Sequence, residues 1–295
     1  MNFLITGGTR FIGKQLTKTL IEKGHHVYIM TRNPEANESS QHTTFVSYQV
    51  QADELPPIYG VVNLAGESLF GRWTIQKKEN IRNSRLEVTE KVIELMRAMV
   101  EKPKVFVSGS AVGYYGTSKE KIFTEETDTP GNDFLSSVVV DWEDMARRAE
   151  RLGIRTVYAR FGIVLGKNGG SFPLMALPVK GFVGGKIGDG EQWISWIHMM
   201  DAANLLEFCI FDDSIKGTVN VTAPDPKRNK DFYRTLATVY RRPYWSSTPG
   251  LFLRIILGEM ATLVLDGQYA YPKKAMEQGF IFQYPKLEKA LESLI

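Results

Sequence analysis

The first thirteen residues of this 295-residue chain, MNFLITGGTRFIG, constrain its fold more than any other stretch. Residues 2–6 form a short apolar run, and residues 6–9 form a turn. From Phe11 onward apolar side chains recur every three or four residues until Gly24, which is typical of a helix end. A strand, a glycine-rich turn and a helix place unpaired N–H groups at a helix N-terminus, where anions bind. The stretch therefore predicts a site for the pyrophosphate of a dinucleotide.

The turn carries one residue that departs from the usual spacing. Gly7 permits the tight turn and Gly13 permits close packing of the helix on the strand, but Arg10 stands where a glycine is usual. Arg10 takes room from the backbone and adds a positive charge near the phosphates. We expect the cofactor loop to consist of Gly7, Gly8, Thr9, Arg10, Phe11, Ile12 and Gly13. A plain strand–helix turn is the alternative interpretation.

Strand-like and helix-like patterns alternate through the first half of the chain. The expected strands are 26–30, 44–48, 59–64, 105–107 and 157–161, and the expected long helices are 81–99 and 134–152. Such alternation predicts an α/β fold with a doubly wound parallel sheet of the Rossmann type.

The alternation of strand-like and helix-like patterns ends after Gly166. A glycine-rich stretch follows, and then helical patterns separated by prolines. These helical patterns lie at 232–240, 252–265, 273–278 and 287–294. We therefore expect a dinucleotide-binding domain of residues 1–166 with a further strand near 218–222. Residues 167–217 and 223–295 are expected to form a substrate-side region and a small, mostly helical C-terminal domain.

Composition excludes several classes of protein. A net charge of +3 without a basic stripe argues against nucleic acid as a partner. The longest apolar stretch, 251–265, contains Arg254 and Glu259 and is too short to cross a bilayer of ~30 Å. Cys209 is the single cysteine, so no internal disulfide can form. With no basic signal-peptide region before the first strand, we expect a cytoplasmic protein without a membrane partner.

The end of the second expected strand carries Arg32, with no acidic residue before Glu35. An acidic residue at this position binds the ribose 2′-OH of NAD, whereas an arginine accommodates the 2′-phosphate of NADP. The sequence therefore favours NADP (NADPH) over NAD, with two solvated arginines as the alternative. The ends of the next strands, where a dinucleotide would cross, add Leu64, the small residues Ala65 and Gly66, and Ser108.

Several motifs together resemble the extended short-chain dehydrogenase/reductase superfamily, and more narrowly its epimerase-like family 39U branch. The matching stretches are TGGTRFIG at 6–13, NLAGE at 63–67, RWT at 72–74, IRNSR at 81–85, SGSAVGYYG at 108–116, DFLSSVVVDWE at 133–143, RFGIVLG at 160–166 and GDGEQWISWIH at 188–198. The C-terminal GEMATLVLDGQYAYPKKAMEQGFIFQYPKLEKAL resembles the small domain of that branch. The resemblance implies a Rossmann-type NAD(P)-binding domain and an oxidoreductase or epimerase of unassigned substrate.

The superfamily's active site combines a serine at the end of strand five with a Tyr-x-x-x-Lys on the next helix. Ser110 matches the serine, but the helix from Phe134 to Glu143 contains neither a tyrosine nor a lysine. Phenylalanine cannot transfer a proton. Tyr114 and Tyr115 are the candidate replacements, provided that a nearby positive charge lowers a tyrosine pKa of ~10. Aromatic packing is an equal alternative for this pair.

The remaining candidates concern the cofactor and the substrate. Arg160 is a source of positive charge near the cofactor, and the expected substrate-binding residues are Arg72, Trp73, Trp196 and His198. Arginine beside tryptophan suits an anionic or planar ligand. No pair of His, Cys or Asp has the spacing of metal ligands, so no metal is expected.

Two functions remain open at this point. One is an NADP-dependent oxidoreductase or epimerase that acts, as a monomer or homodimer, on a small and possibly anionic molecule. The other is a non-catalytic NADP(H)-binding sensor or interaction protein that has lost the Tyr-x-x-x-Lys proton relay.

Overall fold

The computed structural model describes residues 1–295 and is built on one seven-stranded parallel sheet. From edge to edge its strands are β12 (Gly217–Val221), β7 (Arg155–Phe161), β5 (Val105–Ala111), β4 (Gly60–Asn63), β1 (Asn2–Thr6), β2 (His26–Met30) and β3 (Thr43–Val46). The strand order reverses direction between β1 and β4, which is the point where an open α/β sheet binds its ligand. The predicted doubly wound Rossmann fold is confirmed.

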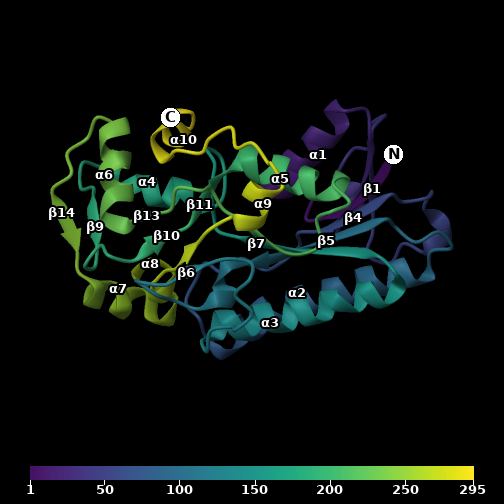
Figure 1. The fold of residues 1–295 in the computed structure, drawn as a ribbon, viewed down its shortest axis with the longest axis horizontal. Coiled ribbons are helices and arrows are strands. Elements are labelled where there is room, and N and C mark those ends of the chain that lie inside the picture. The colour runs from purple at the N-terminus through teal and green to yellow at the C-terminus, as the bar shows by residue number, and fades with distance from the viewer.

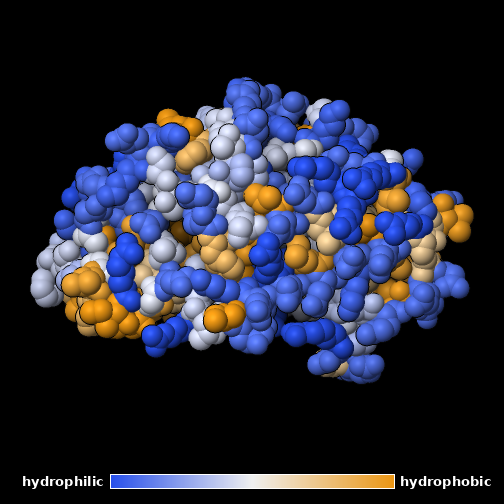
Figure 2. All heavy atoms as spheres, turned by 90° about the horizontal axis from the view of Figure 1, so that it is seen from below, coloured by the Kyte–Doolittle hydropathy of each residue, from blue (hydrophilic) through white to orange (hydrophobic).

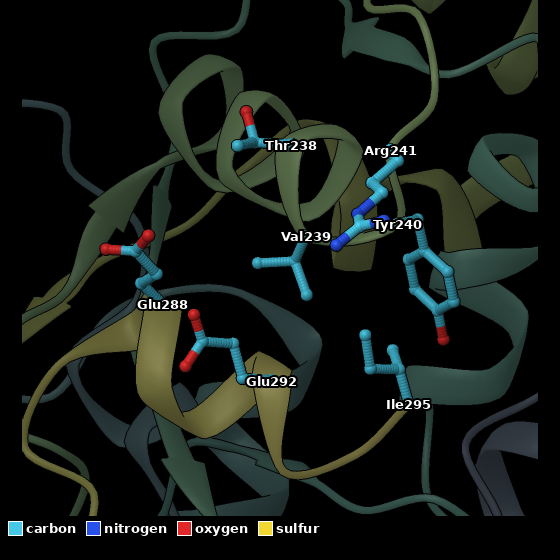
Figure 3. Close-up of a pocket in the computed structure, with 7 residues that line it drawn as sticks. All are labelled: Thr238, Val239, Tyr240, Arg241, Glu288, Glu292 and Ile295. Atoms are coloured by element: carbon cyan, nitrogen blue, oxygen red, sulfur yellow. The ribbon is translucent and has the colours of Figure 1, made fainter.

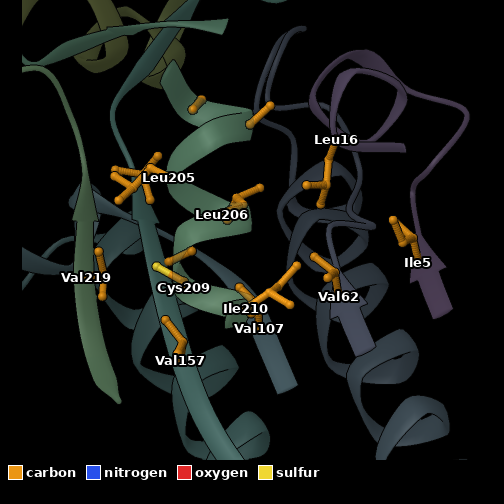
Figure 4. Close-up of a cluster of buried hydrophobic side chains, with 14 of the residues drawn as sticks. Ile5, Leu16, Val62, Val107, Val157, Leu205, Leu206, Cys209, Ile210 and Val219 are labelled. Atoms are coloured by element: carbon orange, nitrogen blue, oxygen red, sulfur yellow. The ribbon is translucent and has the colours of Figure 1, made fainter. Parts of the chain in front are cut away.

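Long helices cover both faces of this sheet (Figure 1). Helices α1 (Phe11–Glu22) and α5 (Met199–Phe211) pack on one face, and α2 (Ile75–Ala98) and α3 (Phe134–Ala146) pack on the other. The larger core cluster fills the space between α1, α5 and the sheet, where Leu16, Leu206 and Cys209 meet the side chains of Val62 and Val107 (Figure 4). Cys209 is therefore a buried core residue of α5.

The other elements form a smaller region beside the carboxyl ends of the strands (Figure 1). Its helices are α4 (Phe172–Lys180), α6 (Asn229–Val239), α7 (Gly250–Leu257), α8 (Thr262–Leu265) and α10 (Leu287–Glu292). Helix α9 (Lys273–Glu277) instead packs against β12, and its Ala275 belongs to the core of the main sheet. Short strand pairs connect the smaller region: β6 (Ile122–Phe123) with β15 (Tyr269–Ala270), β8 (Ile163–Leu165) with β11 (Trp196–His198), β9 (Gly185–Ile187) with β14 (Ser246–Thr248), and β10 (Trp193–Ile194) with β13 (Lys227–Arg228).

Three expected helices differ from the structure in their bounds. Helix α2 begins six residues earlier than expected, because the Thr74 side chain caps it by accepting the Lys77 N–H. Helix α3 ends at Ala146 and continues as a 3₁₀ turn to Leu152. The helix expected at 252–265 is broken at Gly258, whose φ of 60° ends α7.

Helix α5 was not expected, and its place bears on the division of the chain. Residues 199–211 lie in the stretch that the sequence grouped with the substrate-side region, yet α5 packs on the Rossmann sheet beside α1. The helix is apolar on most sides because it lies between the sheet and the C-terminal segment, where Phe208 contacts Phe280. An all-round apolar pattern hides the helical period that sequence reading depends on.

Helix α7 is also apolar except for Arg254, but it buries none of its side chains. Leu251, Phe252, Ile255 and Ile256 are all more than half exposed. Figure 2 shows an apolar patch at its lower left, at the end of the molecule where Figure 1 places α7. No helix of the protein combines the length and the apolar character needed to cross a bilayer.

Candidate functional site

The glycine turn brings β1, α1 and the end of β4 into close contact. Gly7 has a φ of 71°, and a Cβ on it would lie 2.9 Å from the carbonyl carbon of Leu64. A Cβ on Gly13 would lie 2.3 Å from the Gly7 carbonyl oxygen. Both positions therefore require glycine, the first for its backbone angle and the second for space. This is the close approach that a dinucleotide turn needs.

The N-terminus of α1 is open to an anion. Its N-cap residue, Arg10, supplies no side-chain acceptor for the first-turn N–H groups. The Arg10 side chain is exposed and has no carboxylate partner. An anion placed here would satisfy orphan donors and meet the positive end of the helix dipole.

Arg32 stands beside this turn. The register pairs Thr6 of β1 with Met30 of β2, so Thr31 and Arg32 follow directly alongside the glycine turn. Arg32 is exposed and makes no ion pair, which leaves its guanidinium free for a ligand. The structure thus brings Arg10 and Arg32 to the same edge of the sheet, as the sequence predicts for a dinucleotide site.

A chain of buried hydrogen bonds holds the loop after β4. The Thr6 hydroxyl donates to Asn63 Oδ1 at 2.6 Å, and Asn63 Nδ2 donates to the Thr89 hydroxyl at 2.8 Å. The Ala65 N–H donates to Thr6 Oγ1 at 3.2 Å. Because Thr6, Asn63 and Thr89 are fully buried, this network fixes the loop at residues 64–66 against the glycine turn.

Cations surround Glu67, the next residue of this loop. Lys77 Nζ donates to Glu67 at 2.7 Å. That hydrogen bond and the charges of Lys77, Arg32 and Arg85 lower the pKa of Glu67. The charges of Arg32, which follows β2, and of Arg85 in α2 therefore both act on this loop, and the Arg85 guanidinium lies against Gly66.

The predicted catalytic serine lies in a buried ion-pair network. The Ser110 hydroxyl donates to Glu143 Oε1 at 2.5 Å, and Arg160 binds both oxygens of Glu143 at 2.8 Å. All three residues are less than 5 % exposed. Arg160, an expected cofactor contact, is thus held by α3 in this network. Ser108 is also buried and donates to the Gly109 carbonyl.

Both candidate tyrosines have partners for their hydroxyls. Tyr114 donates to the Asp128 carbonyl at 2.6 Å, and Tyr115 donates to Asn220 Oδ1 at 2.8 Å. Burial raises the pKa of Tyr115 to about 12, despite the Arg160 charge. The Arg160 guanidinium lies 3.4 Å from the centre of the Tyr114 ring, a cation–π contact.

The helix that lacks the superfamily's tyrosine and lysine presents apolar residues instead. Phe134 and Val138 of α3 pack in one cluster with Trp73, and Met260 and Leu263 of the C-terminal region complete it. The Trp73 and Phe134 rings meet edge to face at 5.4 Å. Asp141, three residues after Val138 on α3, is paired with Arg82 of α2, and the C-terminal domain packs on the apolar cluster.

The four expected substrate residues separate in the structure. Arg72 is exposed beside Gly258, whereas Trp73 is a buried member of the apolar cluster. Trp196 is fully buried in the second region and donates to the Asp225 carbonyl. His198 is 4 % exposed and caps α5, its Nδ1 accepting the Met200 N–H at 3.1 Å. Burial lowers the His198 pKa to about 4, so the ring is neutral at pH 7.

Two residues of this edge escaped sequence reading as members of the site: Glu143 and Asn220. Glu143 had a usable signal, because it stands four residues after Val139 and seven after Ser136 on the buried side of α3. Asn220 had none, because it meets Tyr115 only through the pairing of distant strands.

A separate open hollow lies between the end of α6 and α10 (Figure 3). Arg241 lines it on one side, and Glu288 and Glu292 line it on the other. None of the predicted site residues borders it, so the candidate site remains the edge formed by the glycine turn and the ends of β2, β4 and β5.

Comparison with known proteins agrees with this architecture. Residues 3–221 match the NAD dependent epimerase/dehydratase family, and residues 248–294 match DUF1731, a domain of unknown function. The chain is 48% identical to the epimerase family protein YfhF of Bacillus subtilis, covering 100% of this chain and 98% of that one. It is 43% identical to epimerase family protein SSP1921 of Staphylococcus saprophyticus over 100% of this chain and 99% of the relative.

Solved structures show the same fold over the full length. The human epimerase family protein SDR39U1, crystallised with NADPH, is 31% identical, with a TM-score of 0.90 over 100% of this chain and 99% of that one. The expected resemblance is confirmed. On the fold, the glycine turn and the match over residues 3–221, this chain belongs to the NAD dependent epimerase/dehydratase family and carries a C-terminal DUF1731 domain.

Proposed function

We propose that this protein binds NADP(H) in preference to NAD(H) and works as an oxidoreductase or epimerase on a small, anionic carbonyl or sugar-nucleotide-like substrate. The observation that carries the cofactor assignment is Arg32. It is an exposed guanidinium without a carboxylate partner, placed by the β1–β2 register beside the glycine turn. A free guanidinium at this position suits a 2′-phosphate.

The residues present fit this cofactor. The Gly7 and Gly13 positions leave no room for a Cβ, and the α1 N-terminus has no side-chain cap, which together favour a pyrophosphate. Arg10 adds a second cation beside the first. That the related human protein was crystallised with NADPH supports the same choice here.

NADP(H), when bound, supplies or accepts a hydride. Ser110 remains our candidate for contact with the reacting oxygen. Its proton points to Glu143, so its Oγ is free to accept a hydrogen bond from a substrate hydroxyl. Of the tyrosine pair we retain Tyr114 as proton donor, since it is only partly buried and lies against the Arg160 charge.

Arg72 is the expected substrate contact that remains open to solvent, and its charge supports an anionic substrate. A cytoplasmic location and a monomer or homodimer complete the proposal.

One observation favours the second function, a non-catalytic NADP(H)-binding sensor. Apolar side chains, Phe134 and Val138, occupy the part of α3 where the tyrosine and lysine of a proton relay would lie. A substrate screen that follows NADPH absorbance separates the two functions. Turnover that disappears in Ser110→Ala identifies an enzyme, whereas NADPH binding without any turnover identifies a sensor.

The cofactor choice is tested by the affinities of wild type and Arg32→Ala for NADPH and NADH. We expect the variant to lose about ten- to a hundred-fold in NADPH affinity while NADH affinity changes little, because one charged phosphate contact is removed. Arg82→Ala is the matched control, since Arg82 is bonded to Asp141. An unchanged preference for the 2′-phosphate in Arg32→Ala would contradict the assignment.

A further inference from the structure

Helix α7 turns an apolar face to the solvent. Its most exposed apolar side chains are 54–73 % accessible: Leu251, Phe252, Ile255 and Ile256. At about 100° per residue, these four positions span an arc of about 140° on one side of the helix. Leu253 and Leu257, on the opposite side, are half-buried. One apolar face therefore attaches α7 to the protein and a second one is uncovered, whereas a surface helix normally shows polar side chains to water.

Exposed apolar side chains continue beside α7. Strand β14 leads into the helix and pairs with β9, so Phe182 and Val183 lie beside Trp245 where the two strands begin. The Trp245 indole N–H donates to the Phe182 carbonyl at 2.9 Å, and all three side chains are more than half exposed. Figure 1 places β14 and α7 at the same end of the molecule. We call residues 182–183, 245 and 251–256 together the α7 surface.

The segments that carry the α7 surface are basic. Residues 172–187 and 240–258 contain no aspartate or glutamate. Their cations are Lys180, Lys186, Arg241, Arg242 and Arg254. Asp189 and Glu259, which follow the two segments, are each bonded to a lysine outside them. Arg241 faces the two glutamates of the hollow in Figure 3, and the other four cations give this end of the molecule a positive charge.

This charge decides among the possible occupants of the α7 surface. In a dimer with a two-fold axis, the same patch of each copy meets the other, so cations would face cations. An anionic surface is complementary instead. Aliphatic and aromatic side chains on one face of a helix, with arginine or lysine beside them, are typical of helices that lie in the headgroup region of an anionic membrane.

The exposed tryptophan fits the same occupant. Tryptophan is enriched where a membrane meets water, because its ring is apolar and its N–H is polar. Side chains that project as far as Ile255 and Trp245 can enter a lipid surface without a preformed groove on the partner. A protein partner would need a groove of matching shape.

The α7 surface also adjoins the candidate substrate side. A Cβ on Gly258, the residue after α7, would lie 4.0 Å from Arg72 Nε. The Gly71 N–H donates to Met260 Sδ at 3.2 Å, so the loop before α2 rests on the segment that follows α7. Phe70 of this loop is itself 45 % exposed. A membrane in contact with α7 would therefore lie next to Arg72.

We propose that the α7 surface docks this protein on an anionic lipid surface, with Phe252 and Ile255 among the acyl chains and Arg254 at the lipid phosphates. Helix α7 has eight residues, whereas a spanning helix needs about 20, so it lies along the membrane. The proposal goes beyond NADP(H) binding and does not depend on it. It replaces the expectation of a protein without a membrane partner, which considered spanning segments and signal peptides.

Sedimentation of the full chain with lipid vesicles tests the apolar part of the contact. Vesicles of equal parts phosphatidylcholine and phosphatidylglycerol are compared with phosphatidylcholine alone, and we expect binding to the mixed vesicles to be about tenfold tighter or more. The double variant Phe252→Gln with Ile255→Gln should weaken this binding about tenfold or more. Ile281→Gln is the matched control, because Ile281 is 87 % exposed outside the α7 surface and its replacement should change nothing.

The charged part of the contact has its own pair of variants. Arg254→Gln should weaken binding to the mixed vesicles about fivefold, because each cation at an anionic surface contributes about that factor. Arg97→Gln, which removes an exposed arginine of α2, should leave binding unchanged. Added salt should weaken wild-type binding, since it screens exposed charges.

Trp245 reports contact with lipid directly. It is 69 % exposed, whereas Trp73, Trp142 and Trp196 are buried. Brominated phosphatidylcholine in the mixed vesicles should quench part of the tryptophan fluorescence, and Trp245→Phe should lose that quenching. Bromine quenches only at short range, so this signal distinguishes lipid from any protein on the same surface.

Three results would overturn the proposal. One is a wild type that binds neither kind of vesicle. Another is vesicle binding that the Phe252→Gln, Ile255→Gln double variant retains in full. The third is a dimer in light scattering that the double variant dissociates while wild type ignores vesicles, which would assign the α7 surface to a second copy. All the substituted side chains are exposed, and thermal unfolding shows that each variant is folded.

Discussion

At Gly13 the backbone of α1 comes so close to the turn that an added methyl group would lie 2.3 Å from the Gly7 carbonyl oxygen. A single side chain, His198, likewise fixes how two segments of the chain meet. His198, an expected substrate-binding residue, is a neutral helix cap whose Nε2 lies 3.2 Å from the Ser293 hydroxyl. Its ring also lies 4.0 Å from that of Tyr284, so it links α5 to the C-terminal segment.

His198 gives a prediction about pH. Burial lowers its pKa from 6.5 to about 4 in the folded protein, so below pH 6.5 the unfolded chain binds the proton more readily. The stabilising contribution of neutral His198 is therefore complete above about pH 6.5 and is lost as the pH falls toward 4. Between pH 7 and pH 5 we expect the loss of this contribution to lower the unfolding free energy by about 2 kcal/mol, measured by urea titration.

His198→Asn is the matched control, because asparagine keeps an N-cap acceptor and does not titrate. The variant should lose about 2 kcal/mol less than wild type over the same pH interval. Equal losses in the two proteins would show that other groups account for the acid sensitivity.

At the scale of elements, α3 is tied to the sheet and to α2 by two ion pairs of different kinds. Glu143 and Arg160 join α3 to β7 and, through Ser110, to β5, with every partner buried. Arg82 and Asp141 join α2 to α3 at the surface. A buried pair that loses one partner leaves a charge in a medium of low dielectric constant, whereas a surface pair leaves it in water.

We therefore expect Glu143→Gln to lower the unfolding free energy by about 3–5 kcal/mol, because it strands the Arg160 charge. Replacing both residues, as Glu143→Gln with Arg160→Met, should cost clearly less than the sum of the single changes. Arg82→Ala should cost about 1 kcal/mol or less. Chemical denaturation of these three variants and of Arg160→Met alone measures the coupling, and additive losses at Glu143 and Arg160 would contradict it.

At the scale of the whole molecule, Asn220 joins three parts of the chain. It stands in β12, accepts the Tyr115 hydroxyl at 2.8 Å and donates Nδ2 to the Tyr271 carbonyl at 2.9 Å. Its own N–H donates to Glu125 Oε1. The end of the Rossmann sheet, the tyrosine loop and the C-terminal domain thus meet at one buried amide.

Asn220→Ala should lower the unfolding free energy by about 2–4 kcal/mol, because it leaves the buried Tyr115 hydroxyl and the Tyr271 carbonyl without partners. Tyr114→Phe is the control, since the Asp128 carbonyl that it releases is exposed to water and should cost about 1 kcal/mol or less. Thermal or urea unfolding measures both, and an Asn220→Ala cost no larger than the control would exclude this linking role.

Much of this protein follows from local sequence. The strand at 26–30, the glycine turn and the start of α1 were predicted from apolar spacing and from the positions of Gly7 and Gly13, because these patterns act over a few residues. The family resemblance and the doubly wound sheet follow from the same motifs. Arg32 could be placed beside the turn because strands β1 and β2 are consecutive and parallel.

The tertiary structure decided what meets across the sheet. Local spacing could not show that Arg160 would turn to Glu143, that Tyr115 would meet Asn220, or that Arg85 would lie against Gly66. Helix α5 was hidden because it is apolar on most sides, which removes the amphipathic signal. The physical reason is the same for these three contacts and for helix α5. Burial and pairing depend on residues far apart in the chain, and the surroundings of a charged side chain are set only when the fold fixes its neighbours.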